Sequence, residues 1–222
     1  MRITHRMTAV VAALVIGIGL LATFAYSQYD KGDKPAAGGA GAGAGGMPQM
    51  SPEQQKEMEA MMKAGTPGAQ HKQIADQFAG TWDCVVSMWM EGNPQPMTSN
   101  GTMKSEMVYG GRYLHMGFKG DFMGQPFEGG GVMGYDNVTK KFFGSWMDNQ
   151  STGMMVSNGT WDAESKKYNF TSEMPDPMTG KLVKCREVLT IADNNHHTHE
   201  MYAPDKSGKE MKMMEIKYTR KM

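Results

Sequence analysis

Apolar and polar residues alternate with a period of two from about residue 80 to the end of the chain, and turn-forming residues interrupt the alternation about every 10 to 15 positions. The alternation is clearest between Tyr168 and Met174. A period of two is typical of half-buried strands, and closely spaced turns are typical of strands joined by hairpins. The pattern predicts about ten strands, at residues 81–91, 98–109, 112–119, 126–135, 140–148, 153–161, 167–174, 181–191, 196–203 and 209–220.

The two ends of this region predict that the sheet closes on itself. A Trp follows Gly80 and Thr81 at the start of the first strand, and Arg220 follows Tyr218 and Thr219 near the end of the last. In a closed antiparallel barrel the first and last strands pair, so Trp82 can face Arg220 and hold its guanidinium over the indole ring. We therefore predict a mainly β fold: a single antiparallel up-and-down barrel with short N-terminal helices. The run Gly129–Gly131 is expected to mark a sharp bend or a bulge in the wall.

Two short helices are expected before the barrel. Ser51-Pro52-Glu53-Gln54 has the residues of a helix N-terminus with a capping box, and the helix runs to about Ala64. A second helical segment at 71–79 leads into the first strand, and the helices are expected to cover or plug one end of the barrel. An apolar stripe at helical spacing on the first helix predicts a packing face formed by Met58, Met61 and Met62.

The N-terminal residues predict export. Arg2 and Arg6 precede an apolar stretch at 9–21, and small residues at 22–25 offer a cleavage site, as in a secretory signal. An uncleaved anchor is the alternative, and it is the only predicted contact with a membrane. The expected organisation is a signal or anchor (1–26), an Ala/Gly-rich tether (27–50), helices (51–79) and the barrel (80–222), in a periplasmic or secreted protein.

Charge and motifs exclude several classes of function. The formal net charge is 0 and no basic patch is visible, so nothing in the sequence would neutralise the phosphates of a nucleic acid. The sequence contains no Gly-x-Ser-x-Gly, phosphate loop or Cys/His dyad spacing. We therefore predict a protein that is not an enzyme and does not bind nucleic acid.

Several short segments resemble known families. Gly-x-Trp at the first strand and an Arg near the C-terminus resemble the calycin group, which includes lipocalins and fatty-acid-binding proteins. Over residues 68–221 the chain is similar to bacterial domain-of-unknown-function family 1579. This resemblance implies a calycin-like barrel in an exported or soluble bacterial protein, and no particular chemistry. It is carried by His71, Phe78–Trp82, Gly134–Asn137, Trp146–Asn149 and Met213–Arg220.

The predicted binding site is the inside of the barrel. If Arg220 faces Trp82, alternation places Tyr218, Met214 and Lys212 on the same inward face, and Tyr218 and Lys212 are the first candidates for contacting a carboxylate or hydroxyl group of a ligand. Glu187 is a third candidate. Methionine accounts for 25 of 222 residues and, as at Met88, suits the lining of an adaptable apolar cavity. We expect a small apolar or amphipathic ligand and no cofactor.

A metal or haem site is the main alternative. Thioether sulfurs suit copper, and His197 and His199 would share one face of a strand, with His115 as a third ligand for zinc. Among calycin-like barrels some hold haem through a late-strand His. A surface-exposed polar strand is the simpler account of the histidines. A further alternative is a domain that interacts with or scaffolds other proteins of the cell envelope.

Two alternatives are open for the cysteines. An exported protein meets oxidising conditions, which favour a disulfide between Cys84 and Cys185. By alternation, however, both point inward from strands that are not neighbours, and a bridge needs Cα atoms within about 7 Å. The second alternative is two buried thiols.

Overall fold

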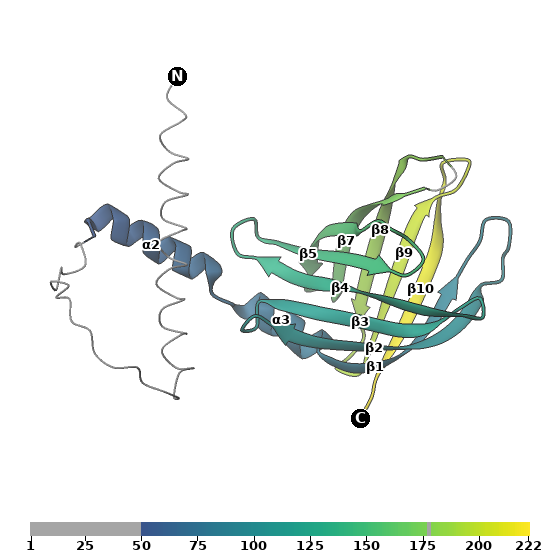
Figure 1. The fold of residues 1–222 in the computed structure, drawn as a ribbon, viewed down its shortest axis with the longest axis horizontal. Helices are drawn as coiled ribbons and strands as arrows, with labels where there is room; N and C mark the ends of the chain where they lie inside the picture. Colours follow the sequence, from purple (N-terminus) through teal and green to yellow (C-terminus); the bar gives the residue numbers. More distant parts are fainter. Residues whose placement is uncertain (1–49, 177–178) are drawn as a thin grey trace, which may run out of the picture. The chain divides into compact units, whose positions relative to one another are not determined.

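The computed structural model describes residues 50–176 and 179–222. The helices α2 (Pro52–Gly65) and α3 (Ala69–Phe78) precede ten strands (Figure 1), and each element begins and ends within about three residues of its predicted bounds. The strands are β1 (Gly80–Met88), β2 (Met97–Val108), β3 (Tyr113–Phe122), β4 (Gln125–Asp136), β5 (Lys141–Asp148), β6 (Met155–Asp162), β7 (Lys167–Pro175), β8 (Leu182–Ile191), β9 (His196–Pro204) and β10 (Glu210–Arg220).

The predicted signal or anchor and the tether up to residue 49 lie outside the described residues. Of the helices that are described, neither has the length and apolar character needed to cross a membrane.

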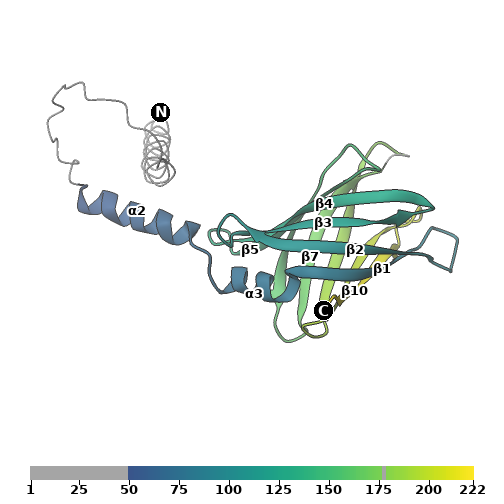
Figure 2. The same ribbon diagram turned by 60° about the horizontal axis from the view of Figure 1, so that its bottom comes forward.

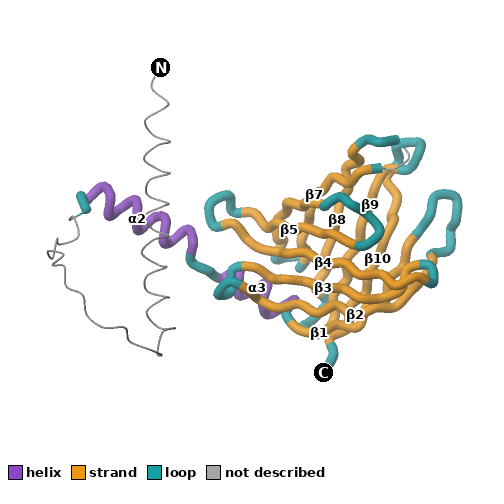
Figure 3. Tube along the Cα trace, viewed as in Figure 1, coloured by secondary structure: helices purple, strands orange, loops and turns teal. Residues whose placement is uncertain are grey.

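The ten strands form one closed antiparallel barrel, as predicted. Each strand pairs with its neighbours in the sequence, and β1 completes the circle by pairing with β10. Figure 3 shows the strands in orange, following one another around the barrel. Along each strand, side chains point alternately to the inside and the outside of the barrel. Trp82 points inward, and the residues that the strand pairing places on the same face of the wall line the interior, which we call the lumen.

One end of the barrel is closed by α3 and the Trp82–Arg220 pair; Figure 2 shows α3 beside the ends of β1 and β2. Ile74 and Phe78 of α3 are buried with aromatic and aliphatic side chains of the barrel. The Trp82 indole donates a hydrogen bond of 2.9 Å to the Phe78 carbonyl oxygen, and the Arg220 guanidinium lies 4.0 Å from the centroid of the Trp82 ring. The predicted contact between these two residues and the predicted plug by a helix are thus confirmed.

Inward-facing aromatic rings lie against glycines of neighbouring strands. The Phe118 ring reaches within 2.2 Å of where a Cβ of Gly101 would be, and the Trp146 ring within 2.4 Å of that position at Gly129. The glycines therefore let these rings lie close to the wall. Pairing continues through residues 129–131 without a register shift, so of the bend or bulge predicted there, the bulge was wrong.

Helix α2 does not use its apolar stripe for packing. None of its residues is buried, and Met61 and Met62 are exposed, so the packing face predicted from the methionines was wrong. Polar contacts hold only its C-terminal end: the Asn137 amide donates to the carbonyl oxygens of Ala64 and Thr66, and Arg112 donates to that of Gly65.

Candidate functional site

Part of the lumen is not filled by side chains. A side chain that points inward keeps solvent-accessible area only where there is room for a water molecule beside it. The half-buried side chains on the inner face of the barrel include Met116, Trp146, Leu189, Met214 and Ile216. The end closed by α3, in contrast, contains fully buried Ile74, Leu114 and Tyr168. The lumen is therefore a cup, with a packed floor at α3 and space above it.

A polar cluster lies on the wall of this cup. Glu187 of β8 is 4% exposed; one of its carboxylate oxygens accepts a hydrogen bond of 2.7 Å from the Ser157 hydroxyl, and the other lies 3.1 Å from His199 Nε2. Ser157 belongs to β6 and His199 to β9, and Ser172 of β7 lies beside them, so four strands build the cluster. We call Glu187, His199, Ser157 and Ser172 the Glu187 cluster.

The surroundings of Glu187 keep its carboxyl ionised. Burial would raise its pKa, but the hydrogen bond and the charge of His199, together with the hydroxyl groups of Ser172 and Ser157, outweigh burial and hold the pKa below its ordinary value. Ser172 faces the carboxylate from β7 and is 5% exposed; it lies close enough to help lower the pKa of Glu187, but its Oγ makes no hydrogen bond of good geometry. The cluster thus contains a buried negative charge and an unsatisfied hydroxyl.

Sulfur-containing side chains surround the cluster toward the open end. Cys185 and Met201 are buried together, and four half-buried methionines pack against them: Met155, Met174, Met213 and Met214. Flexible and polarizable thioethers fit molecules of varied shape. At the rim, Met88 and Met97 line a hollow of about 170 Å³ beside the β3–β4 hairpin. The predictions that Met88 and Met214 face the interior are consistent with this arrangement.

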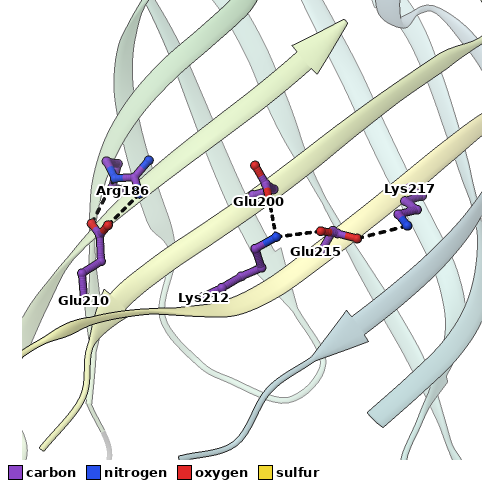
Figure 4. A network of polar contacts seen from close by, with 6 residues as sticks. All are labelled: Arg186, Glu200, Glu210, Lys212, Glu215 and Lys217. Atoms are coloured by element: carbon purple, nitrogen blue, oxygen red, sulfur yellow. Dashed lines mark hydrogen bonds and ion pairs between the residues drawn. The ribbon is translucent and has the colours of Figure 1, made fainter. Parts of the chain in front are cut away.

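Two of the predicted ligand contacts face inward and one does not. Glu187 lines the cup, while Tyr218 is buried near its floor, stacked on His197 with 4.2 Å between ring centroids. Lys212 lies on the outer face. The register of β10 against β9 shifts between Lys212 and Met214, so the side chains of β10 before the shift point to the opposite face from the one that simple alternation predicts. Lys212 therefore forms ion pairs with Glu200 and Glu215 on the outer wall (Figure 4), and its predicted role inside the barrel was wrong.

The histidines do not form the predicted three-residue metal site. His197 and His199 share the inner face of β9, as predicted, so a surface-exposed strand was the wrong account of them. His115 is exposed on the outer face of β3, and cannot join them. In the described part of the chain, no three His, Cys, Asp or Glu side chains are grouped closely enough to hold a metal ion.

Both cysteines are free in the structure. Cys84 in β1 and Cys185 in β8 are buried, and burial raises the pKa of the Cys84 thiol to about 12 and that of Cys185 to about 11. The strands β10 and β9 separate β1 from β8 in the barrel. The structure therefore has the second of the two predicted arrangements, and not the disulfide.

His197 makes the stability of the fold depend on pH. Burial among Phe78, Trp82 and Tyr218 lowers its pKa from 6.5 to about 3, so the unfolded chain binds a proton that the folded protein does not bind between these values. The contribution of His197 to the free energy of unfolding is fully present above pH 6.5 and is lost as the pH falls from 6.5 toward 3. Between pH 6.5 and 5 the free energy of unfolding should fall by about 2 kcal/mol on this account.

His197→Phe keeps a ring in this stack and removes the titration, so urea unfolding at pH 6.5 and pH 5 should show a smaller difference in the variant. His115→Asn removes an exposed imidazole and serves as the control. Its free energy of unfolding should change with pH as that of the unaltered protein does. An equal pH dependence in His197→Phe and the unaltered protein would show that His197 is not buried in its neutral form.

A larger hollow, of about 550 Å³, lies outside the lumen beside the connection from α2 to α3. Its lining includes Arg112 and Asn137, whose side chains already hydrogen-bond to the backbone of that connection. It contains no buried charged group without a partner among the described residues. The Glu187 cluster is therefore the better candidate for a functional site.

The sequence indicated Glu187 as a ligand contact and His199 as a metal ligand, but not Ser157 and Ser172. Ser157 and Ser172 are inward-facing by alternation, and that parity is visible in the sequence. Their position against Glu187 depends on the register of β6, β7 and β8, which aligns Ser157 with Ser172 and Ser172 with Cys185. The signal that could have found them is a small polar residue on an otherwise apolar inner face.

The architecture defines the class of this protein as a calycin-like, lipocalin-type closed barrel. The sequence profile of the family described as "Protein of unknown function (DUF1579)" matches residues 66–220, and the chain belongs to this family. No functionally curated protein matches it in sequence.

A solved structure supports the fold. Rv2717c from M. tuberculosis superposes with a TM-score of 0.53 and 13% identity, covering 70% of this chain and all (100%) of that chain. The S-type phycobiliprotein lyase CPES from Guillardia theta gives a TM-score of 0.47 and 11% identity, covering 68% of this chain and 92% of that chain. At this identity the similarity concerns the fold alone.

Proposed function

We propose that the protein is exported and that its barrel binds a small apolar or amphipathic molecule in the lumen without catalysing a reaction. The observation that carries this proposal is the cup: inward-facing Met116, Trp146, Met214 and Ile216 keep accessible area although they lie on the inner wall. Apolar surface that is exposed inside a concave site is the usual lining of a ligand pocket.

The lining favours an apolar body with a polar group over a fully polar ligand. Methionine and aromatic residues are the commonest side chains on the inner face, and the Glu187 cluster is its main polar feature. A few polar groups in an apolar pocket fix the orientation of a ligand. The many methionines would give the lumen an adaptable lining, because unbranched thioether side chains change their conformation at little cost in free energy.

The proposal is tested by filling the lumen. Gly144 faces inward and the nearest atom to a Cβ there would be 3.7 Å away, so Gly144→Phe places a ring in the cup. We expect the affinity for N-phenyl-1-naphthylamine, an uncharged probe that fluoresces in apolar surroundings, to fall by about tenfold or more. Fluorescence titration of the full chain measures this affinity.

Gly117→Phe is the matched control. Gly117 is also a strand glycine with no atom within 4 Å of its Cβ position, but it lies on the outer face of β3, opposite Lys104 and Gly130. This variant should keep the affinity of the unaltered protein. Probe binding that is lost equally in both variants, or that is absent from the unaltered protein, would contradict binding in the lumen.

A further inference from the structure

The inner wall carries negative charge and almost no positive charge. Among the described residues, the acids that share the inward parity are Glu187 in β8 and Asp148, which pairs with Gly129 near the end of β5. Among the lysines and arginines of the described strands, only Arg220 points inward. The inner wall therefore offers two carboxylates against one permanent cation.

That one cation is already occupied at the closed end. Arg220 donates hydrogen bonds to the carbonyl oxygens of Asn194, Ala79, Asp76 and Gln77, and its guanidinium is stacked on Trp82. A ligand carboxylate in the cup would find no free cationic partner, because the imidazole of His199 is already paired with Glu187, and it would lie near the ionised Glu187. Burying an unpaired negative charge beside another is strongly unfavourable.

The Glu187 cluster has unused capacity to accept hydrogen bonds. A carboxylate has about four acceptor positions, and the contacts with Ser157 and His199 use one at each oxygen. The Ser172 Oγ is buried beside it without a partner. An unsatisfied buried hydroxyl costs free energy that a ligand donor would recover. Both groups can therefore take a further donor, and a positively charged donor is favoured beside the Glu187 carboxylate, of which one oxygen faces His199 and the other only the Ser157 hydroxyl.

We propose that the lumen selects a molecule that carries a protonated amine on an apolar body, with the ammonium group bound between Glu187 and Ser172. This inference rests on the proposed function and names the chemical class of its ligand. The ammonium donates to the free acceptor positions of the Glu187 carboxylate and to the Ser172 hydroxyl. The apolar body contacts the methionines of the cup, and the face of Trp146 is a further favourable neighbour for positive charge.

The test compares three ligands with the same ten-carbon chain: decylamine, decanol and decanoic acid, each at neutral pH and below its micelle concentration. Each displaces N-phenyl-1-naphthylamine from the full-length protein. Decylammonium should displace the probe at a concentration about tenfold or more below that needed for decanoate, because a hydrogen bond to a charged group adds that much affinity.

Two variants assign this preference to the cluster. Glu187→Gln keeps a side chain of the same shape and removes the charge, and should reduce the preference for decylammonium over decanol to within about twofold while the probe still binds. Ser172→Ala removes the unpartnered hydroxyl without opening a large cavity, and should weaken the binding of decylammonium severalfold. Glu200→Gln is the matched control: Glu200 adjoins His199 in the chain and pairs with Lys212, but on the outer wall, and this variant should keep the preference.

The outcomes separate the two proposals. If the unaltered protein does not bind the probe, the proposed function fails. If the probe binds and decanoate displaces it as well as decylammonium does, or if Glu187→Gln keeps the full preference, the proposed function stands and the amine inference is overturned. If Glu187→Gln does not fold, the ranking of the three ligands on the unaltered protein and on Ser172→Ala decides.

Discussion

Arg220→Lys is expected to lower the free energy of unfolding by about 3 kcal/mol, which is a large effect for a change that keeps the charge. The guanidinium of Arg220 fans out to four backbone carbonyl oxygens, and it is the group that joins the end of α3, the loop before β9 and the last strand. A lysine ammonium is a single point on a flexible stem, so it can reach only some of these oxygens and cannot stack as a planar group on Trp82. Urea unfolding followed by tryptophan fluorescence measures the loss.

Arg186→Lys is the matched control for this prediction. Arg186 also stacks on an aromatic ring, with its guanidinium 4.0 Å from the centroid of Tyr202, and it forms a two-pronged ion pair with Glu210. It lies on the outer wall (Figure 4), where solvent screens such pairs, so the variant should lose less than about 1 kcal/mol. Similar losses for both variants would mean that the contacts of Arg220 with the backbone do not hold the end of the barrel closed.

Gly131→Ala is expected to be the other severe change, with a loss of about 3 kcal/mol or more. A Cβ at Gly131 would lie 1.8 Å from the Ser145 carbonyl oxygen, and its next nearest atoms also belong to the backbone of β5. Side chains can rotate away from an added methyl group, but the backbone of a paired strand cannot move without breaking its ladder. The methyl group must therefore push β4 and β5 apart.

Gly144→Ala provides the comparison, because Gly144 lies in β5, also on the inner face, and has its nearest atom 3.7 Å from the Cβ position. Its midpoint of thermal unfolding should stay close to that of the unaltered protein, whereas Gly131→Ala should unfold at a clearly lower temperature. A Gly131→Ala protein as stable as Gly144→Ala would show that β4 and β5 do not pack at the separation described.

The strands and their closure were predictable because they depend on local signals. Alternation and turn residues give the bounds of each strand, and the Trp82–Arg220 pair reports which strands meet when the sheet closes. The parity of Lys212 was not predictable in the same way. The shift between Lys212 and Met214 has no Gly or Pro to mark it, and one extra residue in a strand reverses every side chain beyond it.

The surroundings of the histidines and the glycines were also not predictable from local sequence signals. His197 is polar, but three rings of the closed end compensate its burial through contacts made by residues distant in sequence. The glycines at 129–131 resemble a bulge in the sequence, and only the neighbouring Trp146 ring and Ser145 backbone reveal that they provide space. The Glu187 cluster likewise depends on cross-strand register: Glu187 and His199 were candidates from the sequence for different roles, and only the register brings them together with Ser157 and Ser172.

If an apolar molecule enters the lumen, the methionine methyl groups can report its position directly. Met116, Met201 and Met214 point into the lumen, whereas Met147 is exposed on the outer face of β5. In the full-length protein labelled with ¹³C at the methionine methyl groups, and assigned by single Met→Leu variants, addition of N-phenyl-1-naphthylamine should shift the resonances of the three inward methionines and leave that of Met147 unchanged. A shift confined to Met147 would place the probe on the outer wall and contradict binding in the lumen.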